Sequence, residues 1–271
     1  MPLNLKDHLQ QLSETPAPSG HEGPARDVIQ AAWAPLVDAF EGDGLGNLIA
    51  LKRGTGPAPR RRVMLCAHMD EIGMLVAEVR DGFLRTEPLG GTDYRALLTQ
   101  PVLVHGRRTL PGVFGAAPPH MSRDRAEYPP ADELWIDVGL PADEVSALVR
   151  LGDLVTFDAP FVALRGERVA GKSLDNRASV AAVTVCLDEL TRRAHAWDVV
   201  AVAAVQEEVN LAGAAIAAYQ VQPDLAIAID TTFGAQHGVN DDEGYALGDG
   251  PTLGRGPNFH PGLFKALREL A

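Results

Sequence analysis

The alternation of hydrophobic and polar positions divides the chain into three stretches, of which the first is mixed. Amphipathic periodicity predicts helices over residues 6–13 and 22–33, with a proline-rich turn between them at residues 15–20. Apolar runs predict strands over residues 48–52 and 63–67, split by a turn-rich loop. The opening stretch is therefore typical of an α/β fold.

The middle stretch, from Gly73 to about Arg168, has a different character. Short apolar runs at residues 74–79, 102–105, 134–138 and 154–157 alternate with glycine and proline, and helical periodicity is scarce. This pattern predicts an all-β domain, spanning residues 73–168, that is inserted into the α/β fold.

The last stretch returns to alternating elements. The pattern predicts helices over residues 179–194 and 211–219 and strands over residues 199–205 and 225–229. Such alternation is typical of a mostly parallel central sheet with helices on both faces. We therefore expect residues 1–72 and 169–271 to form one α/β domain around the insert.

Composition narrows the possible partners and the location. The 271 residues carry a formal net charge of -12, which argues against a nucleic-acid or anionic membrane surface as partner. The first 20 residues lack the pattern of a secretory signal, and the longest apolar run is too short for a membrane span, so we expect a cytoplasmic protein. Cys66 and Cys186 lie in apolar contexts that favour reduced core thiols, although Cys66 shares a strand face with His68 and a ligand role stays open.

Candidate metal ligands follow three of the predicted strands. His68 and Asp70 end one strand and share a face, so the carboxylate can accept the second N–H of the imidazole. The pair Glu207 and Glu208 follows another strand, and Asp230 a third. Strand ends of a parallel sheet converge on one crevice.

A fourth carboxylate, Asp175, lies just before a predicted helix. Each acid alone has a structural interpretation: Glu207 and Glu208 favour a helix start, and Asp175 and Asp230 suit capping positions. Taken together with His68, the set favours a metal site, in which one glutamate binds metal and its neighbour acts as general base.

Nine short segments carry a resemblance to a known family. They are Ser19-Gly20-His21-Glu22, Gly46-Asn47-Leu48, residues 67–73, Gly112-Val113-Phe114-Gly115, Pro118-Pro119-His120, Leu174-Asp175-Asn176-Arg177, residues 205–209, Ile229-Asp230 and residues 247–251. As a set they resemble the dinuclear-metal aminopeptidases of metallopeptidase family forty-two, the glutamyl and deblocking aminopeptidases, some of which carry an older cellulase label. The spacing also fits, because the insert precedes the glutamate pair.

The resemblance implies a role for each candidate residue. It makes His68, Asp175 and Asp230 ligands of one divalent ion, Asp175 a bridge to a second ion, and Glu208 a ligand of that second ion. Glu207 is then the general base and Asp70 the residue that orients His68. The implied cofactors are two ions of zinc, cobalt or manganese, and the implied substrates are peptides. The insert is implied to be barrel-like and to mediate homo-oligomerisation.

The chain departs from the family pattern in one respect. Family members carry a late histidine on the second metal, whereas this sequence stops at Ala271, so the resemblance implies a C-terminally truncated relative with an incomplete second site. A catalytically impaired homologue or scaffold with at most one complete site is therefore an alternative. A glycoside hydrolase that uses Glu207 and Glu208 is a third hypothesis. We expect neither His237 nor His260, which lie in loops with glycine and proline, to replace the missing ligand. For the other histidines we expect structural or solvent-facing roles: His8, His21, His105, His120 and His195.

Overall fold

The computed structural model describes residues 3–118, 129–240 and 242–270. The chain forms two compact units, residues 1–230 and residues 231–271, and each is considered by itself. No helix in the described ranges is long and apolar enough to cross a membrane. All of the candidate site residues belong to the first unit.

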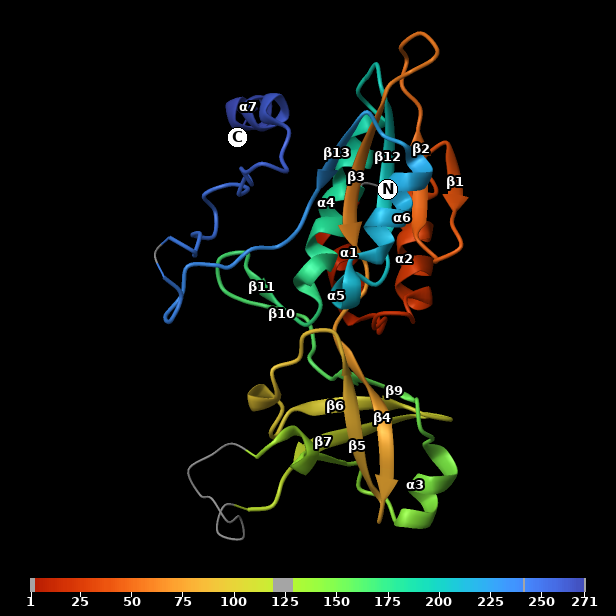
Figure 1. Ribbon diagram of the computed structural model, residues 1–271, viewed down its shortest axis with the longest axis vertical. Coiled ribbons are helices and arrows are strands. Elements are labelled where there is room, and N and C mark those ends of the chain that lie inside the picture. Colours follow the sequence, from red (N-terminus) through yellow and green to blue (C-terminus); the bar gives the residue numbers. More distant parts are fainter. Residues whose placement is uncertain (1–2, 119–128, 241, 271) are drawn as a thin grey trace. The chain divides into compact units, whose positions relative to one another are not determined.

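The first unit contains a five-stranded sheet with the order β1-β2-β12-β3-β13 (Figure 1). The bounds of its strands are β1 Ala39–Gly42, β2 Leu48–Lys52, β3 Arg62–His68, β12 Asp198–Ala204 and β13 Leu225–Ala228. Strands β12, β3 and β13 run parallel, whereas β2 is antiparallel to both β1 and β12. The expectation of a mostly parallel sheet was thus too strong. The short link between β1 and β2 leaves no room for the crossover that parallel pairing needs.

Helices cover both faces of this sheet. Alternate side chains of β2, β3 and β12 pack on one face against α1 (Leu5–Glu14), α2 (Gly23–Trp33) and α4 (Leu174–Leu190). The intervening side chains pack on the other face against α6 (Ala212–Val221). Every residue of β12 is buried, as expected for a central strand covered on both sides.

Six antiparallel strands of the described residues form a closed barrel with the order β4-β5-β8-β7-β6-β9 (Figure 1). The bounds of the strands are β4 Gly73–Arg80, β5 Phe83–Leu89, β6 Pro101–His105, β7 Thr109–Gly115, β8 Trp135–Asp137 and β9 Leu154–Phe157. Apolar side chains inside the barrel form a hydrophobic cluster separate from the two that flank the sheet. A two-stranded ribbon follows, β10 (Val162–Ala163) with β11 (Val169–Ala170).

The segment between Gly73 and Arg168 is not entirely β. It contains the helix α3 (Ala142–Leu148) and the 3-10 turns η1 (Tyr94–Ala96) and η2 (Ala131–Glu133). Val145 of α3 is fully buried in the barrel cluster. The helix is only two turns long, too short for its periodicity to stand out among glycines and prolines.

Two predicted helices have different bounds. α4 begins at Leu174 and ends at Leu190, whereas residues 179–194 were expected. The helix expected at residues 211–219 is α6, preceded by the single turn α5 (Glu207–Asn210). Leu211 separates the two with a φ of 61°, a left-handed conformation that ends one helix and starts another. The second unit contains α7 (Pro261–Leu270).

Candidate metal centre

The site is built around the end of β3. His68 is the last residue of the strand and is 4% exposed, and Asp70, two residues later, is fully buried. Nδ1 of His68 lies 3.2 Å from Oδ1 of Asp70, the partnership expected from the sequence. Because Asp70 engages Nδ1, the other ring nitrogen is left to face the remaining carboxylates.

Three carboxylates surround Nε2 of His68. Oδ1 of Asp175 lies at 3.1 Å, Oε2 of Glu207 at 3.6 Å and Oδ1 of Asp230 at 3.9 Å. They come from the start of α4, the start of α5 and the second residue after the end of β13. Segments far apart in the sequence therefore bring their acids to one imidazole.

The four predicted metal ligands and the predicted base, Glu207, fall into two overlapping groups. His68 with Asp175 and Asp230 forms one, and His68 with Glu207 and Glu208 forms the other, each with ligand atoms within 4.8 Å of one another. Histidine nitrogen and carboxylate oxygen are common ligands of divalent zinc, cobalt and manganese. The donor set therefore fits a divalent metal ion.

The buried Asp70 also holds the chain that carries the two glutamates. Its Oδ1 accepts the backbone N–H of Glu207 and its Oδ2 that of Glu208, both at 3.1 Å, and Ser19 donates its hydroxyl to Oδ2. Gln206, at the start of this turn, has a φ of 55°. A left-handed residue followed by right-handed ones points successive N–H groups at a single anion. Asp70 thus orients His68 and the glutamate turn together.

Proton affinities in the cluster are strongly altered. Burial alone would lower the pKa of His68, but its hydrogen bonds to Asp175 and Asp70, with the charges of Asp70 and Glu207, raise it to about 10. Burial, reinforced by the neighbouring acids, raises the pKa of Glu208 to about 7 and also raises that of Glu207. A carboxylate with a raised pKa can accept and return a proton near neutral pH.

Several buried polar residues next to the site had no role assigned from the sequence. Glu71 accepts the N–H of Ala17 at 2.7 Å and the ammonium of Lys172 at 2.6 Å, and Ser173 donates its hydroxyl to it. Arg177, fully buried, donates to the carbonyls of Leu12 and Thr15. These contacts tie the N-terminal segment to the strand and helix that carry the donors. In the sequence, Glu71 and Arg177 stand out only as members of the segments that carry the family resemblance.

Cys66 behaves as the sequence favoured. It is buried in the cluster beneath α6, and burial together with the charge of Asp230 raises the pKa of its thiol to about 11. Both cysteines are free thiols. A thiol that resists ionisation is a poor metal ligand, so the core role is the better supported one.

Two of the other histidines contact threonine hydroxyls. Nε2 of His8 lies 3.1 Å from the hydroxyl of Thr184, and Nε2 of His105 lies 2.9 Å from that of Thr156. Burial lowers the pKa of both, as expected for neutral core imidazoles. His21 is exposed, and His120 lies outside the described residues.

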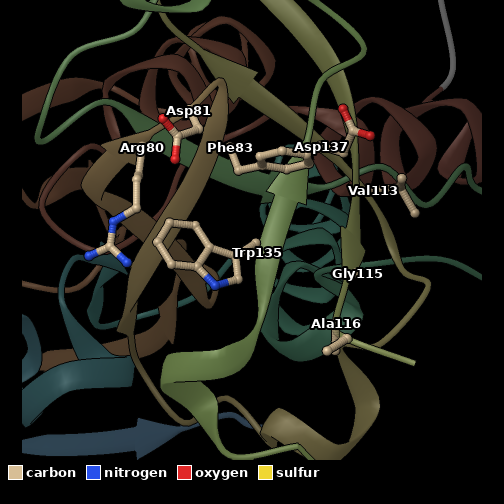
Figure 2. Close-up of a pocket in the computed structure, with 9 residues that line it drawn as sticks. Arg80, Asp81, Phe83, Val113, Gly115, Ala116, Trp135 and Asp137 are labelled. Atoms are coloured by element: carbon tan, nitrogen blue, oxygen red, sulfur yellow. The ribbon is translucent and has the colours of Figure 1, made fainter. Parts of the chain in front are cut away.

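A separate cavity of about 550 Å³ lies on the barrel (Figure 2). Phe83 and Val113 contribute apolar walls, and the guanidinium of Arg80 lies 5.2 Å from the ring centre of Trp135. Its lining residues include none of the metal-site donors. The cavity is therefore distinct from the candidate centre.

In sequence, the chain is similar to known aminopeptidases. A sequence model of the M42 glutamyl aminopeptidases matches residues 46–271. The lysyl aminopeptidase of Pyrococcus furiosus is 33% identical, over 97% of this chain and 77% of its own length. The glutamyl aminopeptidase of Lactococcus lactis is 32% identical, over 93% of this chain and 72% of its own. The chain is thus shorter than these relatives.

The fold of the chain is also similar to those of solved structures. An aminopeptidase from Desulfurococcus kamchatkensis has a TM-score of 0.85 and 37% identity, over 91% of this chain and 69% of its own. The TET1 peptidase of Pyrococcus horikoshii, described as assembling into a tetrahedron or a large octahedral shell, has a TM-score of 0.77 and 33% identity, over 88% of this chain and 72% of its own. A Thermotoga maritima protein described as an endoglucanase has a TM-score of 0.75 and 33% identity, over 96% of this chain and 79% of its own.

Proposed function

Because the chain belongs to the M42 glutamyl aminopeptidase family, a family of metal-dependent peptidases, we propose that it hydrolyses the N-terminal residue of peptides at the His68 centre. One observation carries this proposal: four carboxylates from three separate segments gather around a single buried imidazole. Such a concentration of acids is costly unless a cation compensates it.

In this proposal His68, Asp175 and Asp230 hold one ion, and Asp175 and Glu208 contribute to a second. Zinc, cobalt or manganese bound there would polarise the peptide carbonyl and make a water more acidic. The closeness of Asp175 and Asp230 to Nε2 of His68 supports the first set.

The chain's own groups then have defined tasks. Asp70 accepts the Nδ1 proton of His68 and so fixes the tautomer that presents Nε2 to the site. Glu207 accepts a proton from the attacking water at its carboxylate and returns it to the amine that leaves. Its raised pKa and its position 3.6 Å from His68 support this role.

A catalytically impaired scaffold that binds one ion is the second candidate. What favours it is that both donor groups among the described residues share the same imidazole, His68. One histidine cannot serve as a terminal ligand of two separate ions. Metal stoichiometry separates the two candidates.

The glycoside hydrolase hypothesis is less well supported. The carboxylate pair of such enzymes flanks the scissile bond at about 5 to 9.5 Å. Oxygens of Glu207 and Glu208 lie within 4.8 Å of each other and of His68. That spacing suits shared contact with a metal better than attack from two sides of a sugar.

We further propose that residues 73–168 form an inserted domain that mediates homo-oligomerisation, and that residues 1–72 and 169–271 form the catalytic domain. The closed barrel with its own hydrophobic cluster supports the division. The shells described for the Pyrococcus horikoshii peptidase support assembly. The cytoplasmic location stays a prediction.

Chelation and reconstitution test the proposed activity. The protein is stripped with a chelator, dialysed, and assayed on aminoacyl p-nitroanilides and on carboxymethylcellulose before and after addition of zinc, cobalt or manganese. We expect peptidase activity only after metal addition, and no release of reducing sugar. Peptidase activity that survives complete metal removal would contradict the proposal.

A further inference from the structure

Three consecutive backbone N–H groups at the glutamate turn are held by two buried carboxylates. Asp70 accepts those of Glu207 and Glu208, and Oε1 of Glu22 accepts that of Gln206 at 3.0 Å. Glu22 lies 184 positions before Gln206 and is 7% exposed. The turn between β12 and α5 is thus fixed from two other parts of the chain.

Glu22 does not use its carboxylate to cap the helix that it begins. It stands at the N-cap of α2, where a side chain ordinarily accepts an N–H of its own helix, but its carboxylate makes no such bond. Instead Oε1 accepts the N–H of Gly20 at 2.7 Å and that of Gln206. The side chain therefore serves the glutamate turn and not the helix that it begins.

The turn needs such support. Gln206 is in the left-handed region, which is unfavourable for a residue with a β-carbon. A conformation of this kind persists only where surrounding contacts determine it. Loss of the Glu22 contact would free the Gln206 N–H and let the turn relax, shifting both glutamates.

We propose that Glu22 is a positioning residue that holds the carboxylates of Glu207 and Glu208 in place through the backbone of Gln206. The expected effect on catalysis rests on the proposed function, whereas the hold of Glu22 on the turn does not. Glu22 itself reaches no reacting group. It acts by fixing the first residue of the turn, while Asp70 fixes the next two.

Three variants of Glu22 distinguish the effect of its hydrogen-bond acceptor, Oε1, from the effect of its negative charge. Glu22→Gln keeps an oxygen in the place of Oε1 and removes the charge, whereas Glu22→Asp keeps the charge and withdraws the oxygen. Glu22→Ala removes both. Asp198→Ala is the matched control, because Asp198 is 8% exposed and accepts the N–H of Gly54 at the opposite end of β12.

The first measurement is amide hydrogen exchange at Gln206, Glu207 and Glu208 in the zinc-supplemented protein. For Glu22→Asp and Glu22→Ala we expect about 10- to 100-fold faster exchange, the factor for loss of a hydrogen bond to a charged acceptor. Glu22→Gln should stay near the wild type. Unchanged exchange in Glu22→Asp and Glu22→Ala, or equal acceleration in Asp198→Ala, would overturn the proposal.

The second measurement is the kinetics of aminoacyl p-nitroanilide hydrolysis. Glu22→Asp and Glu22→Ala should lose about 10- to 100-fold in kcat with KM little changed, since misplaced catalytic groups act on the chemical step. Glu22→Gln should retain most of its kcat. A wild type without activity would contradict the proposed function, while the exchange data would still decide the role of Glu22.

Discussion

Nε2 of His68 lies 3.1 Å from Oδ1 of Asp175, although 107 positions separate the two residues in the sequence. The barrel accounts for most of that separation, because the chain leaves the sheet after His68 and returns just before Asp175. Two candidate ligands of one ion therefore bracket the barrel. The centre thus joins a residue just before the barrel with one just after it.

Replacement of Asp70 by alanine should weaken both metal binding and folding. The substitution removes the acceptor for His68 Nδ1 and for the N–H groups of Glu207 and Glu208. We expect metal affinity to fall about 10- to 100-fold. The free energy of unfolding should fall by about 1 to 3 kcal/mol for each buried donor left without a partner. Titration calorimetry and urea denaturation measure the two effects. Wild-type metal affinity in Asp70→Ala would contradict this role.

Gly90 should couple the barrel to the site. A β-carbon at this position would lie 2.9 Å from Cγ2 of Ile72 and 3.1 Å from Cβ of Glu208, and its φ is 86°. We expect Gly90→Ala to destabilise the fold by about 1 to 2 kcal/mol, from the left-handed backbone alone, and to lower kcat. The matched control is Gly91→Ala, where the new atom would meet nothing within 4 Å. Equal kcat in the two variants would show that contact with Glu208 is unimportant.

Metal binding should strengthen as pH rises. Despite burial, the hydrogen bonds to Asp175 and Asp70 raise the pKa of His68 to about 10, so at neutral pH a proton occupies the nitrogen that a metal needs. We expect apparent affinity to rise about tenfold per pH unit between pH 7 and pH 9, and more steeply below pH 7, where Glu208, with a pKa of about 7, is also protonated. Calorimetric titrations across this range measure the slope, and an affinity independent of pH would contradict the assignment.

The same shift affects stability in the absence of metal. The pKa of His68 is higher in the folded state than the ordinary value of 6.5. Protonated His68 therefore makes its full contribution to the free energy of unfolding below about pH 6.5. The contribution is lost as pH rises through about 10. Metal-free His68→Gln should show a smaller loss of stability than the wild type over the same range.

Much of the fold follows from local pattern. The apolar runs before His68, Glu207 and Asp230 become the parallel strands β3, β12 and β13, because a central strand buried on both faces must be almost wholly apolar. The antiparallel edge was not predictable in this way, since β1 is short and partly exposed. Helix α3 was not predicted either, because it is only seven residues long.

The residues of the site likewise differ in whether the sequence could indicate them. The structure brings His68, Asp70, Asp175, Glu207, Glu208 and Asp230 together, and the sequence indicated all six from their positions at strand and helix ends. The contacts of Glu22, Glu71 and Arg177 could not be foreseen. Their partners are backbone groups or side chains far away in the chain, and sequence patterns carry no signal for such long-range pairs.

The central claim is that the two adjacent glutamates have different roles, Glu207 as general base and Glu208 as metal ligand. A paired measurement of Glu207→Gln and Glu208→Gln tests it most directly. Both variants are loaded with zinc, dialysed, and examined by elemental analysis and by aminoacyl p-nitroanilide hydrolysis. We predict that Glu207→Gln keeps the wild-type metal content and loses about 10²- to 10⁴-fold in kcat, because it lacks only the base. Glu208→Gln should lose metal as well as activity. Equal metal loss in the two variants, or substantial turnover by Glu207→Gln, would contradict the account.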